Sequence, residues 1–181
     1  MQLAIIRHLP TAWNKLGLLQ GKRDIEILEP SSSDKKKIEN NFKKISEHQP
    51  FDRVLTSSLI RTQQSASVYG FSSFHKEPLL DELNFGLYEG KPKNLLIEEN
   101  YNDWLNEPRN LTLGEPLVDL ENRIGKFLEK YKMYSSILAF GHGSWIRAAM
   151  SLEQSGDINM MNQITVHNND FIILEFDQKK G

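Results

Sequence analysis

Cysteine is absent from this chain of 181 residues, and the sequence has no long apolar run. The first absence excludes disulfide bonds, thiolate metal sites and cysteine nucleophiles. The second argues against a membrane-spanning helix, because crossing a bilayer takes about 20 consecutive apolar residues. The N-terminus also lacks the basic start and the apolar core of a secretory signal. We therefore expect a cytoplasmic protein without a membrane partner.

An excess of one charge is lacking as well, since 22 Lys and Arg residues stand against 24 Asp and Glu residues, for a formal net charge of -2. This balance gives no general basic field for nucleic acid, so we expect no nucleic-acid partner and only local recognition of anions. The lysine run at residues 35–37 is typical of a solvated helix face. We expect Ile38, Phe42 and Ile45 on the buried side of that helix.

The sequence does contain a regular alternation of apolar and amphipathic stretches. With 39% hydrophobic and 25% charged residues, the chain fits one domain with its own core. The patterns predict strands at residues 3–6, 52–56, 73–79 and 136–140, and helices at 33–48, 58–69, 116–131 and 144–152. Residues 164–167 and 171–176 resemble a closing antiparallel pair with its turn at 168–170. This order predicts the α/β class, as a three-layer α/β/α sandwich with a mostly parallel sheet and one antiparallel edge strand.

The pattern loosens between residues 84 and 113, where Gly, Pro, Asn and aromatic residues surround a short predicted helix at 95–101. We interpret this segment as lid-like, because irregular segments of this length often cover a site. Its aromatic residues either shape the rim of a pocket or pack beneath a loop; they are Phe85, Tyr88, Tyr101 and Trp104.

Arg7 and His8 stand at the carboxyl end of the first predicted strand, the edge where α/β proteins bind their ligands. Neutral imidazole can attack phosphorus, and a guanidinium group can hold the phosphoryl oxygens during transfer. An adjacent cation lowers the pKa of a histidine and so keeps it deprotonated. The pair suggests a phosphate site, although an isolated Arg-His dipeptide is more often an ordinary polar strand end.

Two further segments bring polar groups to the same edge. His142, between Gly141 and Gly143, follows the strand at 136–140, and the next helix directs backbone N–H groups toward an anion there. Arg61 lies in the first turn of a helix, and helical side chains lean toward the helix N-terminus. Taken alone, the two residues are a core histidine and an exposed arginine. We interpret the remaining candidates as exposed arginines or lid contacts; they are Arg53, Arg109, Arg123 and Arg147.

A carboxyl group is needed to protonate the alkoxide that leaves a phosphate ester. Glu82, which follows the predicted strand at 73–79, is the preferred candidate. A partly buried carboxyl group can hold a proton near neutral pH. Asp81 and Glu89 are chemically possible alternatives, and the segment could also be an ordinary charged loop.

Together, four segments resemble the histidine phosphatase superfamily, the phosphoglycerate mutase-like proteins. That family carries Arg-His-Gly, Ser-x-x-x-Arg-x-x-Gln, Glu-x-x-x-Gly-x-x-Glu-Gly and Gly-His-Gly motifs in this order. The matching segments here are Arg7-His8-Leu9, Ser57 through Arg61 to Gln64, Glu82 through Gly86 to Glu89-Gly90, and Gly141-His142-Gly143. The resemblance covers nearly the whole chain, since Gly114-Glu115 and Asn168-Asn169 also look like family positions.

The resemblance implies a role for each matching residue. His8 would accept the phosphoryl group, and Glu82 would donate the proton. Further residues would bind the phosphate or the substrate; they are Arg7, Thr11, Asn14, Arg61, His142 and Gly143. Gln20 and Gly21 would line the entrance. No metal or other cofactor is implied.

Leu9-Pro10 is the clearest departure, because the family usually carries glycine followed by a polar residue there. Leucine rarely takes a positive φ and proline has no N–H, so we expect ordinary backbone angles and one phosphate donor fewer. This difference puts the fit of the substrate in doubt more than the chemistry.

The reaction that the resemblance implies is two-step hydrolysis of a phosphomonoester through a phosphohistidine. A phosphoglycerate-type phosphomutase would use the same site, but the segment between Glu82 and Gly141 looks too short for the larger family insert. A module that binds a phosphorylated ligand without consuming it is the non-enzymatic alternative. The sequence does not distinguish a small phosphate ester from a phosphoprotein as substrate, and it leaves the oligomeric state open.

Overall fold

The computed structural model describes residues 1–176 of the chain. Its strands are β1 (Gln2–Arg7), β2 (Arg53–Thr56), β3 (His75–Lys76), β4 (Ser136–Gly141) and β5 (Phe171–Glu175). Its α-helices are α1 (Ala12–Lys15), α2 (Ser32–His48), α3 (Ile60–Val68), α4 (Lys93–Glu99), α5 (Tyr101–Asn106), α6 (Leu117–Tyr131) and α7 (Gly143–Ser155). Short 3₁₀ helices span Pro78–Leu80, Gly86–Tyr88, Pro108–Asn110 and Met161–Gln163.

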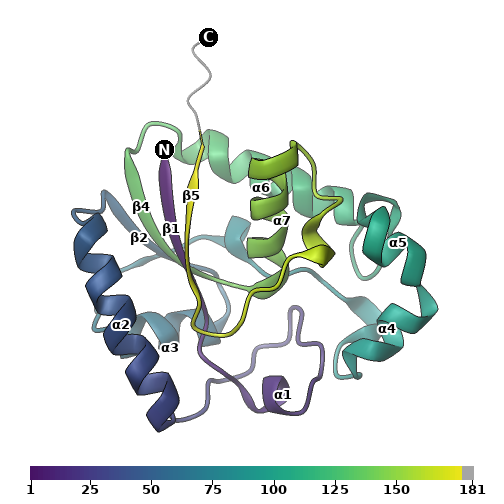
Figure 1. Ribbon diagram of the computed structural model, residues 1–181, viewed down its shortest axis with the longest axis horizontal. Helices are drawn as coiled ribbons and strands as arrows, with labels where there is room; N and C mark the ends of the chain where they lie inside the picture. The colour runs from purple at the N-terminus through teal and green to yellow at the C-terminus, as the bar shows by residue number, and fades with distance from the viewer. Residues whose placement is uncertain (177–181) are drawn as a thin grey trace.

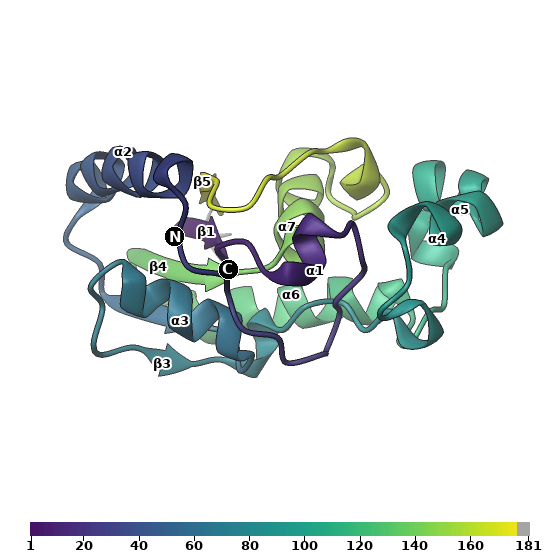
Figure 2. The same cartoon turned by 90° about the horizontal axis from the view of Figure 1, so that it is seen from below.

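The described strands form one sheet in the order β3-β2-β4-β1-β5, and only β5, at the edge, runs antiparallel to its neighbour β1. Helices α2 and α3 lie on one face of the sheet, and α6 and α7 lie on the other (Figures 1 and 2). The predicted three-layer α/β/α sandwich is therefore confirmed, including its antiparallel edge strand.

The alternation of side chains along β1 builds the core on both faces. Leu3 and Ile5 belong to the apolar cluster that contains α6 and α7, while Ala4 and Ile6 belong to the cluster with α2 and α3. All four side chains are fully buried, as a central strand requires, because successive side chains of a strand point to opposite faces. An uninterrupted apolar run is thus the sequence mark of a strand covered on both sides.

The predicted closing hairpin is wrong. Residues 164–167 form no strand, and β5 pairs with β1 instead. The loop that precedes β5 is hydrogen-bonded to the end of β1. Arg7 N–H donates to the carbonyl of Asp170, and Asn169 N–H donates to the carbonyl of Arg7. The apolar residues Ile164 and Val166, which suggested a strand, instead line a pocket at the carboxyl edge of the sheet.

Other elements differ in extent from the sequence prediction. The strand expected at residues 73–79 shrinks to β3, because the chain turns into a 3₁₀ helix at Pro78. The single short helix expected at 95–101 is two helices, α4 and α5. Pro116 is the N-cap residue of α6 rather than part of its first turn. On α2, Ile38 and Ile45 are buried as expected, but Phe42 is 42% exposed.

Across residues 1–176, every helix falls short of the length and apolar character needed to cross a bilayer.

A buried polar cluster joins α2, the end of α3 and the loop before β5. Asn41 donates through Nδ2 to the Tyr69 hydroxyl at 2.7 Å and to the carbonyl of Asn169 at 2.9 Å. The Tyr69 hydroxyl in turn donates to Oδ1 of Asn169. Burial raises the pKa of Tyr69 to about 12, so this hydroxyl keeps its proton and remains a donor. The cluster fixes the loop that adjoins the end of β1.

Tyr69→Phe should therefore destabilise the fold. Removing the hydroxyl leaves Asn41 and Asn169 each with one buried partner fewer, which costs about 1–3 kcal/mol. Urea unfolding at neutral pH measures this difference in the free energy of unfolding. Tyr101→Phe is the matched control, because Tyr101 is 63% exposed. An equal effect of the two substitutions would contradict the role of the cluster.

Candidate active site

Three neighbouring parallel strands end at one edge of the sheet, and each is followed by a polar residue singled out from the sequence. In the register of the sheet, Arg7 at the end of β1 lies opposite Gly141 at the end of β4. β2 ends beside β4, and the chain then enters α3, which carries Arg61. A pocket of about 330 Å³ opens at this edge. The lining includes these predicted residues: Arg7, His8, Asn14, Gln20, Gly21, Arg61, Glu82 and Gly143.

His8 is held with one nitrogen free for attack. Its Nδ1 lies 2.7 Å from the carbonyl of Leu9, and since a carbonyl can only accept, Nδ1 must carry the proton. The lone pair of the neutral ring is then on Nε2. Burial lowers the pKa of His8 well below 6.5, and the positive charges of Arg61 and Arg7 lower it further. A buried, neutral imidazole beside two cations is the state that a nucleophilic histidine needs.

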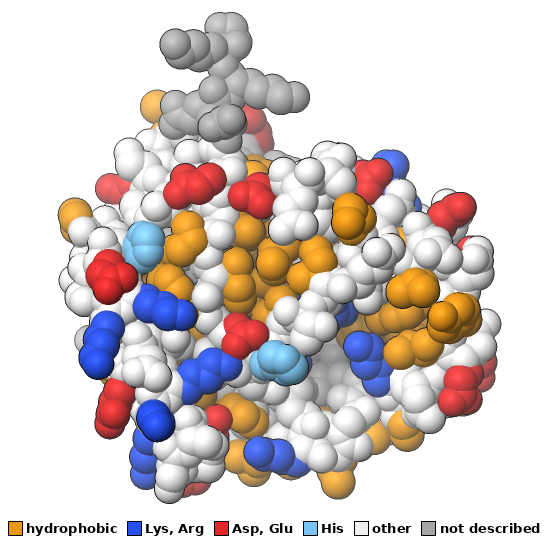
Figure 3. Space-filling view, in the orientation of Figure 1, with side chains coloured by type: hydrophobic (Ala, Val, Ile, Leu, Met, Phe, Trp, Pro, Cys, Tyr) orange, Lys and Arg blue, Asp and Glu red, His pale blue; other side chains and the backbone are white. Residues whose placement is uncertain are grey.

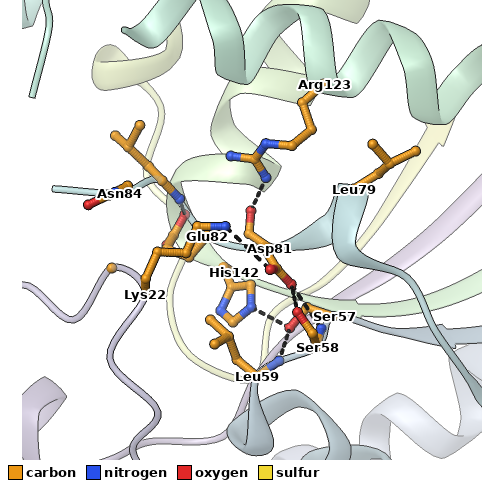
Figure 4. A network of polar contacts seen from close by, with 12 residues as sticks. Lys22, Ser57, Ser58, Leu59, Leu79, Asp81, Glu82, Asn84, Arg123 and His142 are labelled. Atoms are coloured by element: carbon orange, nitrogen blue, oxygen red, sulfur yellow. Dashed lines mark hydrogen bonds and ion pairs between the residues drawn. The ribbon is translucent and has the colours of Figure 1, made fainter. Parts of the chain in front are cut away.

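His142 lies against His8, with 5.3 Å between the ring centroids, and it is fully buried. Its Nε2 is 2.7 Å from the hydroxyl of Ser57 (Figure 4). The same hydroxyl lies 2.9 Å from the hydroxyl of Thr62, so Ser57 bridges His142 and Thr62. The other ring nitrogen of His142, Nδ1, is buried without a hydrogen-bond partner among the described residues. His142 lies behind His8 and is not itself part of the pocket lining.

Arg7 and Arg61 present guanidinium groups that are only partly satisfied. Arg61 donates to the carbonyls of Gly21 and Arg23 at 2.8 and 2.7 Å, and Arg7 donates to the carbonyl of Val166 at 2.6 Å. The Nε atoms of both arginines are buried without a partner among the described residues. Burial lowers the pKa of Arg61 to about 10, which leaves it charged at neutral pH. Two forks of this kind are suited to the oxygens of a phosphate.

Glu82 is the carboxylate of the pocket wall. Its Oε1 accepts from the N–H groups of Leu83 and Trp145 at 2.9 and 3.2 Å, and its Oε2 accepts from Ser144 N–H at 3.1 Å. Ser144 and Trp145 lie in the first turn of α7, so the positive end of this helix helps to position the carboxylate. Its negative charge also acts on the guanidinium groups of Arg7 and Arg61.

The two alternative carboxylates lie outside the pocket lining. Asp81 accepts from the N–H and the hydroxyl of Ser58 at 2.8 and 2.6 Å and pairs with Lys22 at 3.3 Å (Figure 4). Glu89 accepts from Lys22 N–H and pairs with Arg23 at 3.2 Å. Both carboxylates are engaged in holding loops, which leaves Glu82 as the candidate that faces the pocket.

The two remaining predicted residues, Asn14 and Thr11, differ in their position relative to the pocket. Asn14 lines the pocket, but Thr11 is not part of the lining. Thr11 is the N-cap residue of α1, where its N–H and hydroxyl both donate to Oδ1 of Asn14. Asn168 donates to the same oxygen at 3.2 Å and to the carbonyl of His8 at 2.9 Å. Thr11 is thus positioned to orient Asn14 rather than to line the pocket.

Leu9 and Pro10 form the expected ordinary turn. Asn169 is the one described non-glycine residue with a positive φ, so neither Leu9 nor Pro10 adopts that conformation. The side chain of Leu9 packs into the core beneath α2 and α3, and its N–H donates to the hydroxyl of Ser65 at 2.9 Å. The N–H of Leu9 is therefore directed toward α3.

The outer part of the pocket was only partly anticipated from the sequence. Phe85 and Trp104, expected either at a rim or packed beneath a loop, line the pocket, but Lys93 of α4 was missed. Arg147, interpreted as an exposed arginine or lid contact, is a half-buried residue of the pocket wall. Its position gave a usable signal, because residues four apart share a helix face and Gly143 lies four residues earlier. No comparable signal pointed to Lys93.

Comparison with known sequences agrees with this geometry. The sequence model of the histidine phosphatase superfamily (branch 1) matches residues 3–181. Phosphoserine phosphatase 1 of Hydrogenobacter thermophilus is 26% identical over 140 residues, covering 73% of this chain and 64% of that protein. The probable phosphoglycerate mutase GpmB of Yersinia pestis is 26% identical over 125 residues, covering 67% of this chain and 56% of that protein. The chain thus spans less than two thirds of the length of these two relatives.

Solved structures share the fold. The alpha-ribazole phosphatase from Shigella flexneri has a TM-score of 0.76 at 24% identity, covering 99% of this chain and 92% of that one. A phosphoserine phosphatase mutant from Entamoeba histolytica, in complex with phosphoserine, has a TM-score of 0.73 at 21% identity, covering 97% of this chain and 91% of that one.

The two buried histidines should make the fold sensitive to acid. Because the pKa values of His8 and His142 are lowered well below 6.5 in the folded state, the unfolded chain binds more protons below that pH. The free energy of unfolding should fall as the pH drops from 7 to 5, with each histidine contributing at most about 1.4 kcal/mol per pH unit. Urea titrations at several pH values measure this slope.

His8→Gln should make the slope shallower, since one of the two buried titrating rings is removed. His75→Gln is the matched control, because His75 is exposed on β3 and its ring stays in water in both states. An identical slope for wild type and His8→Gln would show that His8 is not held neutral by the fold.

Proposed function

This chain belongs to the histidine phosphatase superfamily, and we propose that it hydrolyses phosphomonoesters in two steps through a phosphohistidine on His8. The observation that carries the proposal is the state of His8, whose ring is buried and neutral and whose Nε2 is free in a pocket with Arg7 and Arg61. Relatives named as phosphatases and as phosphoglycerate mutases support phosphoryl chemistry at this site.

In the first step, the lone pair on Nε2 of His8 forms a bond to phosphorus, and the bond from phosphorus to the ester oxygen breaks. Arg7 and Arg61 hold the transferring oxygens. Glu82 gives its proton to the leaving oxygen, so the alcohol departs neutral.

In the second step, water attacks the phosphohistidine. The Glu82 carboxylate takes a proton from this water while the oxygen bonds to phosphorus, and the bond between phosphorus and nitrogen breaks. The electron pair returns to Nε2 of His8, inorganic phosphate leaves, and Glu82 is again protonated. Every proton is accounted for by Glu82 and water, so the proposed cycle assigns no role to a metal.

The lid-like segment completes the proposed site. Phe85, Lys93 and Trp104 from residues 84–113 stand in the pocket wall. We place the selection of the leaving group here, because the residues proposed to act on phosphorus all come from the edge of the sheet and from the segments that directly follow its strands. We also propose that the protein is cytoplasmic and that its substrate is a small phosphate ester.

His8→Ala should abolish the release of phosphate and the covalent intermediate together. Wild-type protein mixed with a ³²P-labelled ester and quenched in alkali should retain label, and acid should release it, since a phosphohistidine is labile to acid. The same quench of His8→Ala should retain none. Turnover in EDTA tests the expected independence from metal. Label that passes to an added acceptor alcohol rather than to water would indicate a mutase instead.

Glu82→Gln should slow the reaction of a phosphate ester more strongly when the leaving group of that ester is more basic. An alkyl phosphate needs the proton and should lose about 10²–10⁴-fold in the rate of phosphorylation. p-Nitrophenyl phosphate, whose leaving group is stable as an anion, should lose far less. Gln keeps an oxygen for the N–H groups of α7. Asp81→Asn and Glu89→Gln are the controls, and a similar dependence on the leaving group in either would transfer the role of proton donor to that residue.

A further inference from the structure

The pocket contains more positive charge than the phosphate site uses. Beyond Arg7 and Arg61, its lining holds Arg147 from α7 and Lys93 from the first turn of α4. Among the described ion pairs, which extend to 4.0 Å, none includes any of these four side chains. Glu82 is the single carboxylate of the lining.

Arg147 stands beside Arg7 across the start of α7. A Cβ atom on Gly143 would lie 3.2 Å from Cζ of Arg7 and 3.4 Å from Nη1 of Arg147, so both guanidinium groups pack against the same glycine. Arg147 donates from Nη2 to two neutral oxygens, those of Ser144 and Asn162, each at 3.3 Å. Its Nη1 makes no hydrogen bond within residues 1–176, which leaves this donor for a ligand.

Lys93 lines the same pocket as Arg147. Its Nζ lies 5.9 Å from the centroid of the Trp104 ring. Burial, followed by the charges of Arg147 and Arg7, lowers the pKa of Lys93 to about 8. Burial is the main cause, and the charges of the two arginines act in the same direction. Figure 3 shows Lys or Arg side chains at the hollow next to the α4–α5 region.

The dimensions of the pocket restrict what these two cations bind. A volume of about 330 Å³ is at the low end for small-molecule sites. Phe85 and Trp104 stand in the same wall as Lys93. A second charged group must therefore be small and only a few bonds from the phosphate. A carboxylate meets this requirement, and its two oxygens suit both a guanidinium fork and an ammonium group.

We propose that the preferred substrate is a small phosphomonoester whose leaving group carries a carboxylate, bound by Arg147 and Lys93 while Arg7 and Arg61 hold the phosphate. This assignment rests on the proposed phosphatase activity and names the substrate class of the same site. It accounts for the two cations that the phosphate chemistry does not use.

The test compares two esters that differ in one group. 3-Phosphoglycerate carries a carboxylate where glycerol 3-phosphate carries a hydroxymethyl group. Wild type should hydrolyse the carboxylate ester with a kcat/KM at least roughly ten-fold higher, and Lys93→Met should reduce this ratio about ten-fold, as expected for a charge-assisted hydrogen bond. Lys93→Glu should reduce it further. Lys91→Met removes the same charge two residues away, outside the pocket lining, and should leave the ratio unchanged.

The outcomes separate the two proposals. Turnover of both esters at equal kcat/KM would overturn the carboxylate assignment and leave the phosphatase intact. No turnover of either ester or of p-nitrophenyl phosphate would overturn the phosphatase. In that case titration calorimetry with His8→Ala still tests the carboxylate assignment. Binding of 3-phosphoglycerate that is tighter than that of glycerol 3-phosphate, and that depends on Lys93, supports the assignment. Equal affinities for the two esters contradict it.

Discussion

The concentration of desolvated positive charge around one carboxylate is the constraint on which the site depends. Burial lowers the pKa of Arg7, Arg61 and Arg147, and the negative charge of Glu82 acts in the opposite direction on all three. The fold tolerates this because backbone carbonyls and neutral side chains accept guanidinium hydrogens. Burial lowers the pKa of His8, and the charges of Arg61 and Arg7 lower it further.

Much of the site could be predicted from the sequence because it follows the ends of parallel strands. The run before Arg7 and His8 and the run before His142 mark β1 and β4, and neighbouring parallel strands end at one edge. The hairpin failed for a related reason. Alternating apolar residues at 164–167 are equally compatible with a strand and with an irregular wall that buries every second side chain, and only the pairing of β5 with β1 decides between them. Local pattern does not contain that long-range choice.

Leu9 shows how a departure from the family pattern is absorbed. A leucine in place of glycine brings a large apolar side chain, and the core beneath α2 and α3 accommodates it with only 1% of its surface exposed. Its N–H is satisfied by Ser65 on α3. The backbone of Leu9 is thus hydrogen-bonded to α3 through its N–H, while its carbonyl orients His8 through Nδ1. The orientation of His8, the proposed nucleophile, depends on that carbonyl and not on the side chain of Leu9, so a leucine at this position preserves it.

The pocket therefore has two parts, which are held in place by different elements of the fold. The inner part is built on strand ends, whose positions are fixed by the ladder of the sheet. The outer part is built on α4 and α5. Side chains of the 3₁₀ helix Met161–Gln163 hold α5: Asn162 donates to the carbonyl of Trp104 at 3.0 Å, and Gln163 donates to the carbonyl of Leu105 at 3.3 Å. Lys93 N–H also donates to the carbonyl of Gly17 at 3.1 Å. Because the residues of the outer part come from helices outside the sheet, they can change without disturbing the strand ends that hold the inner part. Lys93, from α4, belongs to this outer part.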